Sequence, residues 1–283
     1  MKRAASLLQY THAVVRHIPN SFCEHALRKD TSKLIDLEKA RHQLRVYIEN
    51  LKACGVEVIE LDPNETLPDC TFVEDTAVAV GSRVLLARPG HPSRRKEVTA
   101  IRNCLKNTLG LTDLHEMPDD DTDATLDGGD VLFTGREFFV GQSKRTNASG
   151  LKILSDTFPE FPVTGISVSD KLHIQDVATM ATGDVVIGGG DATAKEIFQN
   201  IKSSAHFPYT FIDVETDGGV NVLAVNDHVF HKTKQEIGEA FYRTLLDKVK
   251  AKPVEMSFTE FAKADGSLTC CSLRLNLHYR QLT

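Results

Sequence analysis

The chain of 283 residues has 33 basic and 39 acidic residues, a formal net charge of -6, and 41% hydrophobic residues. That apolar content is enough for a substantial core, while the scattered basic residues exclude the electrostatic footprint of a nucleic-acid-binding or anionic-membrane-binding protein. Polar residues interrupt the N-terminal segment MKRAASLLQYTHAVV too early for a signal peptide, and no stretch reaches transmembrane length. We therefore expect a cytoplasmic protein whose partner is a small molecule.

The cysteine content gives a second indication of compartment. Six cysteines are too sparse for a disulfide scaffold in a chain of this length, so we expect reduced thiols. Two of them, Cys270 and Cys271, are adjacent in the segment DGSLTCCSLRL, whose pattern predicts a strand. A buried cysteine in a strand is more often inert packing than a reactive group, so the pair by itself leaves its role open.

In chain order, the first predicted helix runs from Leu34 to about Ala53, with Gly55 as its C-cap. Four segments follow in which β-branched and aromatic residues alternate on both sides of a tight turn, and each predicts a β-hairpin. The predicted turns fall at Gly81-Ser82, Gly135, Gly183-Asp184 and Asn226-Asp227.

A helix is predicted after each hairpin, followed by a further strand. The apolar helix faces are formed by Val98, Ile101 and Leu105 after the first hairpin and by Leu151, Leu154 and Phe158 after the second. The third and fourth helices are predicted to open with capping boxes, from Thr193 to Glu196 and from Thr233 to Glu236. The segments LTDLHEM, FPVTGISV and YTFIDV read as the further strands.

The pattern of hairpin, helix and strand thus occurs four times. A fifth unit can be built from LTCCSLRLNL near the C-terminus and YTHAVVRHIP near the N-terminus, which would close a ring by joining the two ends of the chain. Repeats that bury their faces only against neighbours favour one continuous architecture. We therefore expect a single domain over residues 1–283, with a generic α/β fold of coincidental spacing as the alternative.

A polar segment precedes each hairpin, and in a ring these segments would meet at one end of the central axis. They are LPDCTFVED, TLDGGD, LHIQD, ETDGG and KADGS. Their convergence would gather Asp69, Glu74, Asp75, Asp127, Asp130, His173, Asp265 and Cys270 around one pocket. A pocket so rich in carboxylates favours a cationic ligand. Taken singly, Asp-Gly pairs are common turn formers and a lone histidine is more often solvated than catalytic.

Longer strings carry a family resemblance. THAVVR, LPDCTFVED, RPGHPSRRKEV, TLDGGDVLFTGREFFVGQSKRTN and DGSLTCCS resemble the corresponding segments of dimethylarginine dimethylaminohydrolases, from about residue 11 to residue 272. The resemblance implies an α/β five-bladed propeller of repeated ββαβ units, the pentein fold. It also implies hydrolysis of asymmetric dimethylarginine and monomethylarginine to citrulline and dimethylamine or methylamine, with no cofactor.

The resemblance also implies the catalytic roles. Cys270 would attack the guanidinium carbon to give a covalent thiouronium intermediate, while Cys271 would face the opposite side of the strand. His173 would protonate the leaving amine and then activate water, and Asp127 would orient and stabilise its imidazolium. A bound guanidinium beside Cys270 would favour the thiolate.

The remaining implied roles concern substrate binding. Glu74 and Asp75 would hold the guanidinium, with Asp265 as a further contact. Asp69 and the backbone of Leu27 would take the α-amino group, Arg94 and Arg145 would take the α-carboxylate, and the backbone of Ala264 would contribute. Leu27 lies in a segment, residues 20–30, that we expect to act as a lid. An inhibitory zinc ion at Cys270 and His173 is also compatible with these residue types.

Three other interpretations stay open at this stage. An arginine deiminase or amidinotransferase would use the same scaffold and a cysteine nucleophile. A metal hydrolase would use His228, His231 and the vicinal cysteines, although residues three apart in a strand face opposite sides. A non-catalytic ligand-binding or interaction homologue would be expected to have lost one of the catalytic residues.

Overall fold

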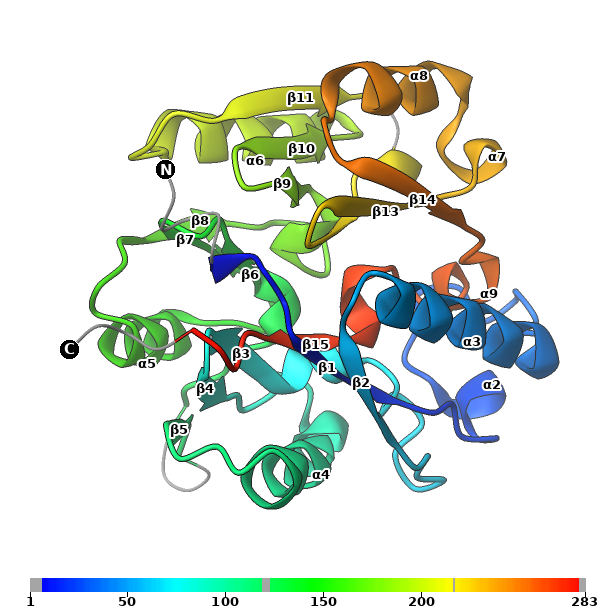
Figure 1. Cartoon of the computed structure of the whole chain (residues 1–283), viewed down its shortest axis with the longest axis vertical. Helices are drawn as coiled ribbons and strands as arrows, with labels where there is room; N and C mark the ends of the chain where they lie inside the picture. Colours follow the sequence, from blue (N-terminus) through cyan, green and yellow to red (C-terminus); the bar gives the residue numbers. More distant parts are fainter. Residues whose placement is uncertain (1–6, 119–122, 216, 280–283) are drawn as a thin grey trace.

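The structure is a computed structural model that describes residues 7–118, 123–215 and 217–279. Its strands form five three-stranded sheets arranged around a common centre like the blades of a propeller (Figure 1). In each sheet the inner and middle strands are antiparallel, and the middle and outer strands are parallel. The ring of five units expected from the repeat, and the five-bladed α/β propeller implied by the family resemblance, are therefore confirmed.

The blades follow one another along the chain. From inner to outer strand they are β3 (Ala77–Val80), β4 (Arg83–Leu86) and β5 (Leu114–Glu116); β6 (Val131–Phe133), β7 (Phe138–Gln142) and β8 (Val163–Ser167); β9 (Ala178–Thr182), β10 (Val185–Gly189) and β11 (Thr210–Val214); β12 (Leu223–Val225), β13 (His228–Lys232) and β14 (Lys252–Met256); and β15 (Leu273–Leu275), β1 (His12–Arg16) and β2 (Glu57–Leu61). The inner strands contact one another around the centre, so residues at their ends are brought together.

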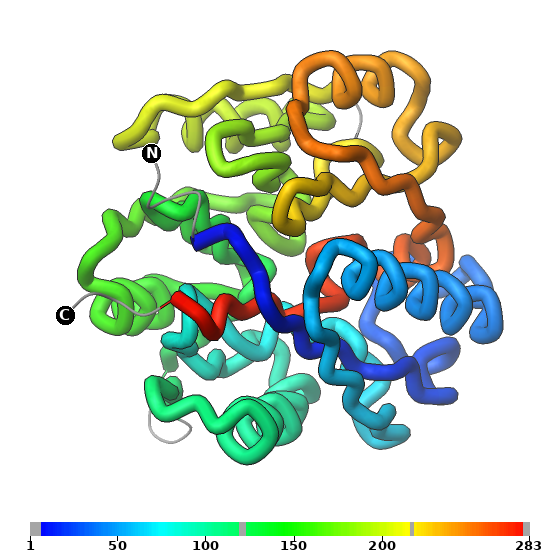
Figure 2. Tube along the Cα trace, viewed as in Figure 1, coloured from blue at the N-terminus to red at the C-terminus, as the bar shows by residue number. Residues whose placement is uncertain are grey.

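The fifth blade closes the ring by pairing the two ends of the chain, as the sequence predicts. Strand β15 pairs antiparallel with β1, so that Leu275 lies opposite His12 and Leu273 opposite Val14. Figure 2 shows this pairing as the red C-terminal segment running beside the blue N-terminal one at the centre of the molecule. The centre of the ring, where the inner strands meet, is called the hub below. It depends on contacts between residues more than 250 positions apart in the chain.

Hairpin turns and helix starts follow local chemistry, with two corrections. Gly81, Gly135 and Asn226 adopt positive φ in the predicted turns, a region that glycine and asparagine tolerate. The first long helix begins at Leu37 rather than Leu34, because Asp36 caps it by accepting a hydrogen bond from the Lys39 N–H.

The helices on the outside of the ring are α2 (Phe22–His25), α3 (Leu37–Ala53), α4 (Val98–Asn103), α5 (Ala148–Thr157), α6 (Ala192–Ser204), α7 (Lys234–Ile237), α8 (Glu239–Lys248) and α9 (Thr259–Ala262). The capping box predicted at Thr193 is wrong: the N-cap of α6 is Asp191, two residues earlier, and its side chain accepts from the Ala194 N–H. The box from Thr233 to Glu236 is confirmed at α7.

A short 3₁₀ turn stands in front of every inner strand. These turns are η1 (Val73–Thr76), η4 (Gly128–Asp130), η5 (Ile174–Asp176), η6 (Asp217–Gly219) and η7 (Thr269–Cys271). Cys270 and Cys271 thus lie in a turn and not in the strand that the sequence predicts, since β15 begins only at Leu273. The tight turn gives each polar segment a fixed backbone, which presents its side chains at the hub.

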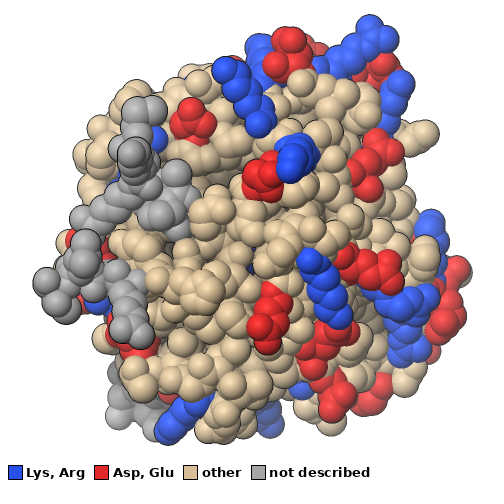
Figure 3. Space-filling model, viewed as in Figure 1, with Lys and Arg blue, Asp and Glu red and all other residues tan. Residues whose placement is uncertain are grey.

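Two surface properties match the composition. On the face seen in Figure 3, basic and acidic side chains are interspersed, and no large field of one sign covers the part drawn in colour. Within the described ranges no helix combines the length and apolar character needed to cross a bilayer. The cytoplasmic location and the single domain over residues 1–283 stay predictions, and residues 1–6, where the N-terminal segment begins, lie outside the described residues.

Helix α3 fastens the turn that carries the cysteine pair. The fully buried Tyr47 hydroxyl donates to the Leu268 carbonyl at 3.0 Å and lies 2.7 Å from the Ser272 hydroxyl, and these two residues bracket η7. The Tyr47 ring packs edge-on against Phe230 with 6.0 Å between the ring centroids. Packing and hydrogen bonding therefore both hold η7 against the outer helix layer.

Replacing Tyr47 by phenylalanine is expected to lower the free energy of unfolding by about 1–3 kcal/mol, because buried groups at Leu268 and Ser272 lose their partner. Urea unfolding followed by circular dichroism measures the change. Tyr242→Phe is the matched control, since no hydrogen bond of its hydroxyl is present in the described part of the chain, and it should change stability by less than about 0.5 kcal/mol. Equal effects of the two substitutions would show that the Tyr47 hydroxyl does not fasten η7.

Candidate active site

A narrow pocket opens at the end of the hub where the 3₁₀ turns meet. Most of the residues expected there line it: Leu27, Asp69, Asp75, Arg94, Arg145, His173, Ala264, Asp265 and Cys270. The three exceptions are Asp127, which is fully buried against His173, Asp130, which is also fully buried, and Glu74, which lies on a separate cavity at the rear. The ring therefore gathers side chains from segments as far apart in the chain as Leu27 and Cys270, as the polar segments predict.

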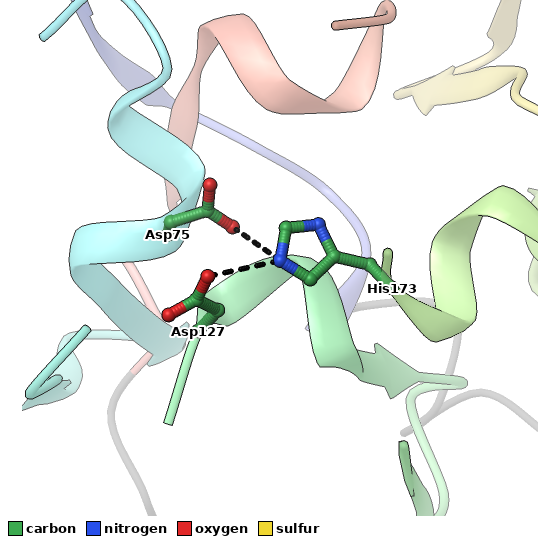
Figure 4. A group of neighbouring side chains, drawn as sticks. All are labelled: Asp75, Asp127 and His173. Atoms are coloured by element: carbon green, nitrogen blue, oxygen red, sulfur yellow. Dashed lines mark hydrogen bonds and ion pairs between the residues drawn. The ribbon is translucent and has the colours of Figure 1, made fainter. Parts of the chain in front are cut away.

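The imidazole of His173 is held by carboxylates. Its Nε2 lies 2.9 Å from Asp127 Oδ2 and 3.8 Å from Asp75 Oδ1 (Figure 4). Burial alone would lower the pKa of His173, but Asp75, Asp127 and Asp130 outweigh it and raise that pKa to about 10. The ring is therefore an imidazolium at neutral pH, able to donate a proton without first collecting one.

Two glycines, which have no side chains, allow His173 and the neighbouring backbone and carboxylates to approach one another closely. A Cβ on Gly129 would lie 2.6 Å from His173 Nδ1, and one on Gly128 would lie 2.0 Å from the Glu74 carbonyl oxygen. The Gly129 N–H instead donates to Asp75 Oδ1 at 2.9 Å. The Gly-Gly pair in TLDGGD is thus required by close packing at the hub and not only by a turn.

Asp130 forms part of the frame behind the histidine. One carboxylate oxygen accepts from the Ile174 N–H at 3.0 Å, and the other accepts from the Ser143 hydroxyl at 2.6 Å. Burial raises the pKa of Asp130 to about 7. These bonds connect η4 to η5 and fix the backbone that carries His173.

The two cysteines have separate environments. Cys271 is fully buried in the apolar core beneath the turn, whereas Cys270 is partly exposed and lines the pocket. The Cys270 Sγ accepts a hydrogen bond from the Ser267 N–H at 3.3 Å. Burial, followed by the charges of Glu74 and Asp75, raises the pKa of Cys270 well above its usual range. Without a ligand this sulfur is a neutral thiol.

Arg94 organises Asp75. It is buried, and its guanidinium donates to Asp75 Oδ2, to the Phe72 carbonyl at 2.9 Å and to Glu97 Oε2 at 2.8 Å. Although burial opposes ionisation of Asp75, His173 and Arg94 lower the pKa of that carboxyl. Asp75 therefore stays a carboxylate beside the sulfur.

Arg145 has spare hydrogen-bonding capacity. Its Nη1 is buried without a hydrogen-bond partner in the described structure, and it lies 3.6 Å from Asp127 Oδ2. A buried guanidinium nitrogen without an acceptor is costly, so an anionic group of a ligand would stabilise it. Of the two arginines in the pocket, Arg145 is thus the freer donor.

The segment expected to act as a lid is attached to pocket carboxylates. The Leu27 N–H donates to Asp69 Oδ1 at 3.0 Å, and the Lys29 N–H donates to Asp265 Oδ2 at 2.6 Å. Burial raises the pKa of Asp69, while Arg94 opposes that rise. Backbone of this segment therefore forms one wall of the pocket.

Glu74 occupies a different position from its neighbour in sequence. It faces the rear cavity and lies 3.6 Å from Arg274 Nη2, measured from Oε1. Asp75 lines the pocket with Cys270, whereas Glu74 lines the rear cavity. The expected role of both carboxylates in holding the guanidinium stays a prediction.

The described structure brings together one group of potential metal ligands. Ligand atoms of Asp75, Asp127 and His173 lie within 4.8 Å of one another. The inhibitory zinc ion expected at Cys270 and His173 stays a prediction. His228 pairs with Asp227 at 2.7 Å, and His231 is buried with Nδ1 at 2.8 Å from the Lys232 carbonyl. Neither of these histidines belongs to a potential ligand group within the described ranges.

Sequence reasoning missed several residues of the site. Glu97, which pairs with Arg94, has a pKa raised to about 7, first of all by burial. The spacing of three residues between Arg94 and Glu97 in one helical segment was the available signal. Phe72, Leu172 and Gly266 also line the pocket and carry no chemical signal in the sequence.

Comparisons with known proteins agree with this arrangement. The family model described as "N,N dimethylarginine dimethylhydrolase, eukaryotic" matches residues 17–184. The human protein named "Putative hydrolase DDAH2" is 33% identical over 279 residues, covering 95% of this chain and 96% of that protein. The N(G),N(G)-dimethylarginine dimethylaminohydrolase of Pseudomonas aeruginosa is 28% identical, covering 84% and 89% of the two chains.

A solved structure gives the corresponding view of the fold. A Pseudomonas aeruginosa dimethylarginine dimethylaminohydrolase mutant complexed with citrulline superposes with a TM-score of 0.81 at 24% identity, covering 94% of this chain and all of that one. Together with the match of the family model to more than half of the chain, these findings show that the chain belongs to the dimethylarginine dimethylaminohydrolase family.

Proposed function

We propose that the protein hydrolyses free asymmetric dimethylarginine and monomethylarginine to citrulline, with release of dimethylamine or methylamine. The observation that carries the proposal is the convergence of Cys270, the His173–Asp127 pair and Asp75 on one pocket. A nucleophile, a proton donor oriented by a carboxylate, and a negative group for a cationic substrate are the parts this reaction needs. Family membership supports the same chemistry.

Substrate binding would follow the charges of the pocket. The substrate guanidinium would donate to Asp75. The α-carboxylate of the substrate would accept from Arg145 Nη1, which makes no hydrogen bond to the described residues. The α-ammonium would donate to Asp69 and to carbonyl oxygens of Leu27 and Ala264, since the Leu27 N–H already serves Asp69. Recognition of both α-groups would restrict the enzyme to free amino acids.

Binding would also activate the nucleophile. The neutral thiol of Cys270 faces carboxylates, which oppose its ionisation. A substrate cation between them would offset their charge and lower the pKa of Cys270, so the thiol would lose its proton to solvent only when substrate is present. His173 already carries its proton in the free enzyme and is therefore not the acceptor.

The covalent chemistry would then proceed in two halves. A bond forms between Cys270 Sγ and the guanidinium carbon, and the bond from that carbon to the methylated nitrogen breaks as His173 gives its proton to the departing amine. The neutral imidazole then takes a proton from water, whose oxygen attacks the thiouronium carbon. The carbon–sulfur bond then breaks, and the added oxygen passes its remaining proton to the sulfur as it becomes the carbonyl of citrulline. Citrulline leaves with the thiol and the imidazolium restored.

Replacing Cys270 by serine is expected to abolish citrulline formation from asymmetric dimethylarginine, a loss of roughly 10³-fold or more in kcat. Replacing Cys271 by serine tests the neighbouring sulfur, which packs in the core, so kcat should stay within a few-fold of wild type. A colorimetric citrulline assay run in parallel with unmethylated arginine separates this activity from arginine deimination. Loss of activity in the Cys271 variant alone would mean that the wrong sulfur has been chosen.

Replacing Asp127 by asparagine is expected to lower kcat by about 10²–10⁴-fold and to move the alkaline limb of the kcat profile to lower pH. The neutral amide removes one charge that raises the pKa of His173, so the imidazolium loses its proton earlier as pH rises. Asp213→Asn, at an exposed surface carboxylate on β11, is the matched control and should leave the profile unchanged. An unshifted alkaline limb in the Asp127 variant would argue against His173 as the proton donor.

Citrulline binding is expected to slow amide hydrogen exchange in residues 26–31, because a ligand that contacts the Leu27 backbone would restrain the segment above the pocket. Hydrogen-exchange mass spectrometry of the wild type with and without citrulline measures the effect. Peptides from the middle of α3 serve as the internal control and should not change. Identical exchange in residues 26–31 under both conditions would rule out a lid role.

A further inference from the structure

Arg274 forms a second cationic contact at the hub that the reaction described above does not use. It lies on β15, four positions after Cys270, with its side chain 16% exposed. Its Nη2 is 3.6 Å from Glu74 Oε1, and its Nη1 donates to the Ser272 hydroxyl at 3.4 Å. The guanidinium also lies over the Tyr10 ring, 5.6 Å from the centroid. Three contacts from different segments thus fix the position of this charge.

Glu74, which pairs with Arg274, is almost completely buried. Its side chain is 7% exposed, and its Oε2 has no hydrogen-bond donor among the described residues. Both side chains line a rear cavity of about 100 Å³ formed by residues from the inner strands. Burial raises the pKa of Glu74, and Arg274 is the main group that opposes this rise. Removing the guanidinium would leave a buried carboxylate with no cation.

The charge on Glu74 also reaches the nucleophile. The ionisable groups that act on Cys270 come from η1 (Glu74 and Asp75), from η5 (Asp176) and from β13 (Lys232). Arg274 and Asp75 act on Glu74, with Thr269 and Gln175 as hydrogen-bonding neighbours, and the charge of Glu74 also acts on Tyr47 and Cys271. The turn η1, which carries Glu74, contacts η7, which carries Cys270, so Glu74 is placed to pass the effect of Arg274 on to the sulfur.

We propose, building on the proposed function, that Arg274 is a positioning residue of the active site. Its guanidinium keeps Glu74 ionised and fixed behind Cys270. The hub therefore has enough negative charge to attract a cationic substrate and to hold the free nucleophile as a thiol. Arg274 itself touches no part of the substrate pocket. Its effect would reach the sulfur only through Glu74.

The arrangement has a definite consequence for Arg274→Leu. With the guanidinium gone, Glu74 would take up a proton at neutral pH, as a buried unpaired carboxylate does. The loss of that negative charge would make ligand-free Cys270 more acidic and its alkylation faster. It would also weaken substrate binding, so KM should rise at neutral pH and recover as the pH is raised and Glu74 ionises again.

The test measures alkylation of ligand-free Cys270 by iodoacetamide between pH 6 and 10, with the modified residue identified by tandem mass spectrometry. Arg274→Leu should speed alkylation at pH 7 by about tenfold, the effect of a shift of about one unit in the pKa of Cys270. Glu74→Gln should give the same profile, and the double variant should show no further change, because each substitution removes the negative charge of Glu74, one directly and the other by leaving that carboxyl protonated. Arg274→Lys should keep the wild-type profile.

Three results would overturn the proposal: an unchanged alkylation profile in folded Arg274→Leu, additive effects of the two substitutions in the double variant, or a profile in Arg274→Lys as altered as that in Arg274→Leu. Thermal melts confirm folding, and the double variant covers the case in which Arg274→Leu alone does not fold, because it leaves no unpaired charge.

Alkylation of Cys270 does not require the enzyme to turn over substrate. If the wild type failed to convert dimethylarginine while the predicted alkylation pattern appeared, the proposed function would fail and the role of Arg274 would stand.

Discussion

Buried negative charge at the centre of the ring must be matched by positive charge. This balance determines the protonation state of His173 and Cys270. Asp75, Asp127 and Asp130 raise the pKa of His173 to about 10 and so keep it protonated, although burial opposes this. Arg94 and Arg274 compensate Asp75 and Glu74 from two sides. Burial, followed by the charges of Glu74 and Asp75, raises the pKa of Cys270 well above its usual range, so the free sulfur is a thiol. A cationic ligand is the natural addition to such a site, because it offsets the negative charge that remains.

The propeller makes this concentration of charge possible. Each blade contributes one short 3₁₀ turn before its inner strand, and residues in or beside four of these turns supply the carboxylates, the imidazole and the thiol. The strands behind the turns are apolar, and helix α3 fixes η7 through the Tyr47 hydroxyl. Closure by β1 and β15 completes the ring and places Arg274 beside Tyr10. The fold thus provides a rigid frame, in which pKa values are set by neighbours from distant parts of the chain.

The sequence predicted the features that depend on repetition and on local chemistry. Turn residues such as Gly81 and Asn226 marked the hairpins, and complementary strands at the chain ends indicated the fifth blade. It failed where tertiary packing overrides local pattern: the strand-like residues around Cys270 form a turn because Tyr47 and the core hold them, and Asp191 caps α6 in place of Thr193. That Glu74 and Asp75 line different cavities could not be predicted, since a one-residue step gives no direction until the turn geometry is known. Roles for Asp69, Arg145 and Asp265 came from family resemblance, and the structure places these residues in the pocket without testing their roles.

The central claim is that Cys270 is a neutral thiol until a cation enters the carboxylate pocket. The most direct test is the ultraviolet absorbance of the thiolate near 240 nm, titrated from pH 6 to 10 in the wild type and in Cys270→Ser, with and without guanidinium chloride well below denaturing concentrations. The difference between the two proteins reports Cys270 alone. The account predicts little thiolate at pH 7 without guanidinium and a titration displaced to lower pH in its presence. A Cys270 that is already ionised at pH 7 without ligand, with a titration that guanidinium does not move, would contradict it.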